Sequence, residues 1–210
     1  MSPPRSEVPV RERLLTAADE LFYAEGVHTV GIDRVLEHAG VAKASLYGTF
    51  GSKDELVRAY LEERGRATRA RTAARMETFD DPRDKILCVF DLLAETAKEG
   101  SFRGCAFVNA CAEGPKGPTP ARDVSSKQRK WRRDLFAELA KELGVGDPEE
   151  TARQLALLYD GAVVGAWMDA DPSRPMTARR VAESLLHSEV PASAPPKAHA
   201  RSSKKRASAK

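Results

Sequence analysis

Long apolar runs are absent from the sequence, and cysteine is scarce. A membrane-spanning helix needs about 18 mostly apolar residues in a row, and no segment approaches that length. Residues 1–15 lack the apolar stretch of a signal peptide, so we expect a cytoplasmic protein without a membrane partner. The three cysteines, Cys88, Cys105 and Cys111, form no CxxC pair. We therefore expect neither a disulfide framework nor a metal site, and no cofactor.

A strong excess of charge of one sign is also missing. The chain has 34 Lys and Arg residues against 31 Asp and Glu residues, a net charge of +3. Residues 191–210 hold six cations and no acid, so residues 1–190 carry −3, the whole-chain value less those six. Overall charge therefore does not indicate a nucleic-acid partner, and local placement of cations must decide. The four histidines are scattered and no HExxH motif or phosphate-binding loop occurs, so we expect no enzyme.

Apolar residues recur at helical spacing along most of the chain, and no useful alternating strand pattern is present. This predicts an all-α protein of about nine helices. Ser52 and Glu55 form a capping box that begins a long helix reaching about Thr72, with Glu55 bonding back to the cap. We expect disordered segments at 1–9 and 191–210, a three-helix unit at 10–55 and a larger helical domain at 56–190.

Two short amphipathic helices, at about 31–39 and 42–49, are separated by Gly40. A helix-turn-helix needs such a tight turn, together with apolar residues that lock the two helices. The locking candidates are Ile32, Val35, Ala39, Val41 and Leu46. The second helix then presents an acid-free polar face, formed by Lys43, Ser45, Tyr47 and Thr49. Lys53, at the start of the next helix, is placed to reach a phosphate.

The stretch LLTAADELFYAEG, followed by GIDRVLEHAGVAKASLYGTFGSKDEL, resembles the N-terminal DNA-binding domain of the TetR (tetracycline-repressor-like) family. The elements AGV, LY, F and SKDEL carry this resemblance. It implies a homodimeric repressor that leaves a palindromic operator on double-stranded DNA when an unknown small-molecule effector binds the C-terminal domain. It also implies phosphate contacts from Tyr47 and Lys53. The remaining DNA-contact candidates are Arg34, Ala42, Lys43, Ala44, Ser45 and Thr49.

Three positions depart from the family pattern. Ala42 stands where a serine often caps the second helix, so a cap worth about 1 kcal/mol is missing. Leu36 occupies a crossing position that is usually small, and Gly48-Thr49 replaces a larger residue and a histidine. The operator is therefore not predicted by analogy. A plain three-helix bundle is the structural alternative, because residues 1–52 hold five basic residues against seven acids.

The last two long helices are the predicted dimer interface. Small residues in the first permit close helix approach, and the second carries an apolar stripe. The interface candidates are Leu158, Gly161, Ala162, Gly165, Leu185 and Leu186. The alternative is that these stripes belong only to the core of one subunit.

The middle helices are predicted to hold the effector in an apolar cavity. The pocket candidates are Phe90, Phe102, Cys105, Phe107, Asn109, Trp131 and Tyr159. Asn109 either orients a ligand or caps a chain reversal. Cys105 either senses oxidants, since it lies near a helix N-terminus, or is a small buried residue. The first possibility defines an alternative function, that of a redox-sensing or small-molecule-binding regulator acting through Cys105. The basic run at 127–133 is predicted to be a solvated face.

Overall fold

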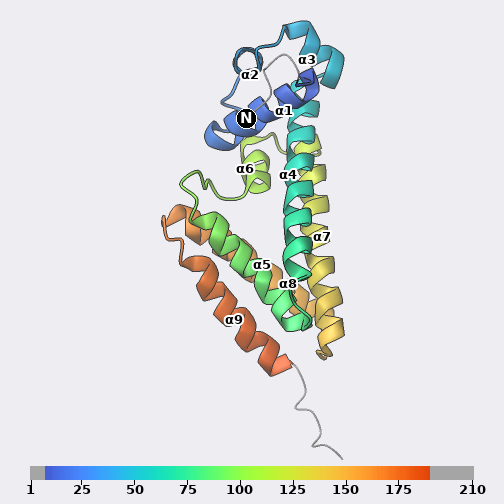
Figure 1. Cartoon of the computed structure of the whole chain (residues 1–210), viewed down its shortest axis with the longest axis vertical. Coiled ribbons are helices and arrows are strands. Elements are labelled where there is room, and N and C mark those ends of the chain that lie inside the picture. Colours follow the sequence, from blue (N-terminus) through green and yellow to red (C-terminus); the bar gives the residue numbers. More distant parts are fainter. Residues whose placement is uncertain (1–7, 190–210) are drawn as a thin grey trace, which may run out of the picture.

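The computed structural model describes residues 8–189, and this part of the chain holds nine α-helices and no strand (Figure 1). The all-α prediction is confirmed. The helices are α1 (Val10–Glu25), α2 (Ile32–Ala39), α3 (Lys43–Phe50), α4 (Lys53–Met76), α5 (Pro82–Ala97), α6 (Ala106–Glu113), α7 (Pro120–Leu143), α8 (Pro148–Met168) and α9 (Arg174–Glu189). The predicted disorder at 191–210, and most of that at 1–9, lies outside the described residues.

Helices α1, α2 and α3 pack together at one end of α4, which Figure 1 shows as a unit at the top of the molecule. Val35, Ala39 and Leu46 are buried between them, and Ile32 and Val41 pack against the same core. The apolar residues expected to lock the two short helices therefore do so. Because these residues take the inner faces, the outer face of α3 remains exposed.

The start of α4 is capped by Ser52, whose Oγ accepts a hydrogen bond from the backbone N–H of Glu55 at 3.1 Å. The expected return bond from the Glu55 side chain is replaced by an ion pair with Arg58, in which the nitrogen and oxygen lie 3.0 Å apart. Helix α4 continues to Met76, beyond the expected end near Thr72. Ala42, at the cap position of α3, supplies no side-chain bond, as its methyl group dictates.

Two 24-residue helices, α4 and α7, lie side by side along the length of the molecule (Figure 1). Gly65 of α4 allows this approach, because a Cβ there would lie 3.0 Å from Gln128 Oε1 and 3.6 Å from the Phe107 ring. The core beneath α1–α3 also takes in Phe107 of α6 and Val124 of α7. Since α4 runs through position 55 without a break, a domain boundary between 55 and 56 stays a proposal.

The second core is formed by α5, α7, α8 and α9, with Phe90 stacked on Phe136 at 6.2 Å between ring centroids. Pro175 lies in the first turn of α9. A proline is tolerated there, because an amide in the first turn has no helical partner to lose. Within residues 8–189, no helix is long and apolar enough to cross a bilayer.

Candidate functional site

The outer face of α3 is the first candidate site. Lys43, Ala44, Tyr47 and Thr49 are exposed there, with Ala42 exposed just before the helix and Ser45 half-buried. The Tyr47 side chain is 48% exposed although it is aromatic, so it is free to contact a ligand. The Thr49 hydroxyl donates to the Ser45 carbonyl at 2.6 Å, which leaves its oxygen lone pairs on the surface.

Two of the side chains predicted to contact DNA, Lys43 and Arg34, are paired with carboxylates of the same chain. Lys43 Nζ lies 3.1 Å from Asp33 Oδ1, and this hydrogen-bonded partner raises the pKa of Lys43. Arg34 Nη2 donates to Glu25 Oε1 at 2.8 Å. Both pairs are exposed, so a phosphate can replace each acid at little energetic cost.

Lys53 begins α4, where the first backbone N–H groups have no partner within the helix. Its ammonium group lies 5.9 Å from the centroid of the Phe22 ring. Partial burial lowers the pKa of Lys53. The arrangement fits a phosphate contact from both the side chain and the helix end.

The turn between α2 and α3 is held by Arg13, which the sequence did not single out. Its guanidinium donates to the Ala39 carbonyl at 3.0 and 2.6 Å and also to the Gly40 carbonyl. Gly40 has φ of +63°, a left-handed conformation that glycine adopts without strain. These contacts join residues 26 and 27 positions apart, so they tie α1 to the turn between α2 and α3.

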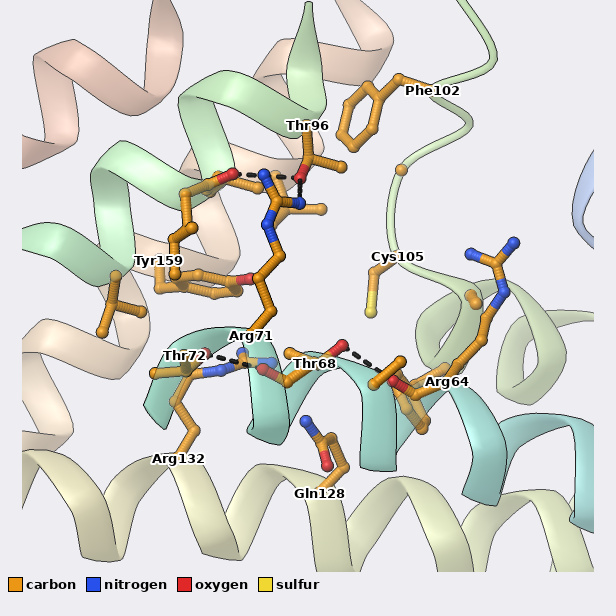
Figure 2. Close-up of a pocket in the computed structure, with 18 of the residues that line it drawn as sticks. Arg64, Thr68, Arg71, Thr72, Thr96, Phe102, Cys105, Gln128, Arg132 and Tyr159 are labelled. Carbon is orange, nitrogen blue, oxygen red and sulfur yellow. Dashed lines mark hydrogen bonds between the residues drawn. The ribbon is translucent and has the colours of Figure 1, made fainter. Parts of the chain in front are cut away.

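A cavity of about 480 Å³ is the second candidate site, and residues from α1, α4, α5, α6, α7, α8 and the segment before α6 line it (Figure 2). Five of the predicted pocket residues lie in its wall: Phe102, Cys105, Phe107, Trp131 and Tyr159. Phe90 is instead sealed in the second core, against Phe136 and Tyr159. Asn109 also lies away from this cavity, and its amide donates to the Arg103 carbonyl at 2.9 Å, as in a chain reversal.

The polar lining of this cavity was not predicted. It includes Arg64, Thr68, Arg71, Thr72, Thr96, Gln128 and Arg132, together with the acids Asp19 and Glu63. Arg132, from the run expected to be solvated, is 7% exposed, and its guanidinium lies 3.9 Å from the Tyr159 ring centroid. The sequence pattern that could have indicated this lining is the spacing of Arg64, Thr68 and Thr72, which lie four residues apart on one face of α4.

A second cavity, of about 490 Å³, is lined by Cys105 and by residues of α6, α7 and α8. The two cavities share Cys105, Phe107, Gln128 and Arg132. Cys105, at the cap position of α6, therefore borders both spaces. All three cysteines are free thiols.

Helix α1 connects the first cavity to the helix-turn-helix. The Tyr23 hydroxyl accepts from the Arg103 backbone N–H at 2.9 Å and donates to the Gly104 carbonyl at 3.0 Å. The Arg64 guanidinium lies 3.7 Å from the Tyr23 ring centroid and donates to Asp19 at 2.5 Å. Because Asp19 and Tyr23 both line the cavity, a molecule bound there meets the first helix of the N-terminal unit.

The predicted dimer residues divide into two groups. Gly161 is exposed, and Leu158, Gly165 and Leu185 are half-buried on α8 and α9. Ala162 and Leu186 are buried in the second core of the same chain, so they leave no surface for a partner. The exposed apolar residues of these helices are Leu157, Val164, Trp167, Met168 and Val181. Any partner surface on α8 and α9 therefore has to include these exposed apolar residues.

Known proteins of similar sequence are regulators of transcription. Residues 14–60 match the family described as bacterial regulatory proteins, tetR family. The HTH-type transcriptional regulator YjdC of Escherichia coli is 24% identical over 179 residues, which cover 84% of this chain and 93% of that protein. The HTH-type transcriptional repressor NemR of Escherichia coli is 28% identical over 169 residues, covering 75% and 83%. These relatives are not enzymes.

Solved structures extend the likeness to nearly the whole fold. SCO4454, a TetR-family transcriptional regulator from Streptomyces coelicolor, superposes with a TM-score of 0.81 and 34% identity, over 86% of this chain and 95% of that one. A putative TetR transcriptional regulator, sav143 from Streptomyces avermitilis, superposes with a TM-score of 0.78 and 34% identity, over 87% of this chain and 98% of that one. With this identity across both of its helical units, the chain belongs to the TetR family of DNA-binding transcriptional regulators.

Proposed function

We propose that the protein is a repressor that binds a palindromic operator as a homodimer and leaves it when a small molecule fills the first cavity. The exposed face of α3 supports the DNA contact, with Tyr47 and Lys53 on phosphates and Lys43, Ser45 and Thr49 toward the major groove. Ala42, Ala44 and Arg34 flank this surface. One such face reads a single half-site, so two-fold pairing doubles the contacts.

The observation that carries the ligand response is the participation of α1 in the cavity wall. Asp19 and Tyr23 belong to the helix that packs on α2 and α3, yet both line the cavity. We call α3 the recognition helix. A ligand that favours one position of α1 thereby favours one separation of the two recognition helices in a dimer. DNA affinity falls when that separation does not match the operator, which is a population shift between two arrangements.

Pairing through α8 and α9 is supported by the apolar residues left exposed on them. Leu157 and Met168 are 71% and 72% exposed, and Val181 is 49% exposed. The backbone of α8 is open beside Gly161, where an added Cβ would meet no atom within 4 Å. Two such helices from each subunit form a four-helix contact, with Leu158, Gly165 and Leu185 at its edges.

The test is selection of DNA fragments by the full chain, followed by a mobility-shift titration at several salt concentrations. We expect one palindromic sequence, a salt-sensitive shift, and weaker binding for Tyr47→Ala. Reporter transcription from a promoter that carries the selected site should fall when the protein is present. Selection of no sequence, or increased transcription, would contradict the proposal.

A second candidate is a redox-sensing regulator that acts through Cys105, favoured because this thiol borders both cavities. Burial raises the pKa of Cys88 to about 11, so that thiol is protonated and unreactive near neutral pH. Loss of DNA binding on treatment with diamide, prevented by Cys105→Ala but not by Cys88→Ala, would support this alternative.

A further inference from the structure

Gln128 lies on α7 where the two cavities meet, and it is 1% exposed. Its Oε1 accepts a hydrogen bond from Arg69 Nη1 at 2.5 Å. A guanidinium only donates, so this bond fixes which end of the amide carries the oxygen. Figure 2 shows the side chain projecting from α7 toward α4 and the cavity, with its nitrogen outermost.

The nitrogen end of this amide is unsatisfied. Gln128 Nε2 is buried and has no hydrogen-bond partner among the residues that the structure describes. Buried donors are nearly always paired, because leaving one unpaired destabilises the fold. Gln128 therefore offers a donor whose pairing with a ligand oxygen costs no existing protein bond.

Positive charge surrounds the same point. Arg129 and Arg132 both pair with Asp160, at 2.7 and 3.3 Å, so two guanidinium groups share one carboxylate. Arg69 forms no ion pair within residues 8–189. Around Gln128 there are thus three guanidinium groups and one carboxylate, and the other acids that line the first cavity, Asp19 and Glu63, pair with Arg64 and Arg66. In a partly buried site this imbalance attracts an anion strongly.

The first cavity supplies an apolar compartment beside this charge. Phe102, Trp131 and Tyr159 contribute aromatic rings to its wall, and Val163 an aliphatic surface. Burial raises the pKa of Tyr159, which keeps its hydroxyl protonated. A volume of about 480 Å³ lies within the range of cavities that hold small organic ligands.

We propose that the effector is a flat, apolar carboxylic acid. Its carboxylate accepts hydrogen bonds from Gln128 Nε2 and from Arg132 at the junction of the cavities, and its ring system lies in the first cavity against Phe102 and Tyr159. This inference rests on the proposed function in taking the cavity as the effector site. It adds the chemical class of the effector and the residue that selects it.

The test compares two probes of the same shape, 2-naphthoate and its neutral counterpart 2-naphthamide, by calorimetric titration of the full chain without DNA. We expect 2-naphthoate to bind at least about tenfold more tightly, the factor expected for a hydrogen bond to a charged group. In Trp167→Phe, Trp131 is the remaining tryptophan. Its fluorescence should be quenched by 2-naphthoate, which locates the probe in the first cavity.

Variants assign the role of Gln128. Gln128→Met keeps the side-chain length and should weaken 2-naphthoate binding about tenfold while changing 2-naphthamide binding little. Gln128→Glu places like charge at the junction and should weaken 2-naphthoate binding further. Gln154→Met is the matched control, because Gln154 is a half-buried glutamine of α8 that lines neither cavity. It should leave both affinities unchanged.

Equal affinity for the two probes would overturn the proposal, as would a Gln128→Met effect no larger than that of Gln154→Met. So would a failure of 2-naphthoate to bind at millimolar concentration. Mobility shift with the selected DNA separates this inference from the proposed function. A protein that shifts DNA but ignores 2-naphthoate remains a regulator with a different effector, whereas one that binds 2-naphthoate but shifts no DNA loses the repressor assignment.

Discussion

The Tyr23 hydroxyl of α1 donates a hydrogen bond to the Gly104 carbonyl, 81 positions away in the sequence. It also accepts from the N–H of Arg103, so one oxygen ties the segment before α6 to the N-terminal helices. Tyr23→Phe removes both bonds but keeps the ring beneath Arg64. We expect the free energy of unfolding to fall by about 1 kcal/mol. In hydrogen exchange, the Arg103 amide should lose protection.

Tyr47→Phe is the control for this change, because its hydroxyl is on the exposed face of α3 and forms no hydrogen bond within residues 8–189. It should alter neither measurement. Normal protection of the Arg103 amide in Tyr23→Phe would mean that the link is not maintained in solution.

Two glycines near the recognition helix should respond oppositely to alanine. At Gly40, with φ of +63°, a Cβ would lie 2.9 Å from Arg13 Nη2, so Gly40→Ala should lower the free energy of unfolding by about 1–2 kcal/mol. At Gly48, inside α3, a Cβ meets nothing within 4 Å. Gly48→Ala should raise the free energy of unfolding by up to about 1 kcal/mol. Urea denaturation measures both, and changes of the same sign would contradict the backbone argument.

Asp33 is expected to oppose DNA binding, because it holds the Lys43 ammonium at 3.1 Å. Asp33→Asn should lower the pKa of Lys43 toward its ordinary value, since the hydrogen-bonded carboxylate is what raises it. DNA affinity at low salt should increase severalfold, and the gain should shrink as salt screens the charges. Fluorescence anisotropy with labelled DNA measures this.

The matched control for Asp33→Asn is Glu142→Gln, which removes one exposed charge at the far end of α7. An equal gain from both variants would show that net charge, and not the release of Lys43, is responsible.

Charge placed on the apolar face of α8 and α9 should separate the subunits. Leu157→Glu combined with Val181→Glu buries two carboxylates in the proposed contact, which is strongly unfavourable without partners. We expect light scattering to give the mass of one chain, against two for the native protein. Val10→Glu, at an exposed valine of α1, should remain dimeric. A dimer that survives the double substitution would place the interface elsewhere.

Much of the N-terminal unit could be predicted from the sequence, because its structure is set by contacts between neighbouring residues. Gly40, the apolar set around Leu46 and the polar face of α3 lie within 20 positions of one another, where helical periodicity decides which side is buried. Arg13 escaped notice because its partners, Ala39 and Gly40, lie 26 and 27 positions away. Nothing local distinguishes such an arginine from a solvated one.

The cavity shows where this reasoning stops. Phe90 and Phe102 have the same side chain, yet Phe90 is buried in the second core and Phe102 borders the first cavity. Neighbours from three other helices decide which of the two environments each ring has. Arg132 occurs in a basic run typical of a solvated surface, and only Asp160 and the Tyr159 ring from α8 explain its burial. For the same reason Ala162 and Leu186 were assigned to a partner although their own chain covers them.

Helix α4 extends without interruption from Lys53, beside the recognition helix, to Met76, beyond the cavity. At 1.5 Å per residue its 24 residues measure about 36 Å. A tilt of about 5° around the cavity end would carry the other end sideways by roughly 3 Å, close to one base-pair step along the duplex axis. A rigid rod of this length therefore converts a small local rearrangement into a mismatch of register between the protein and its DNA.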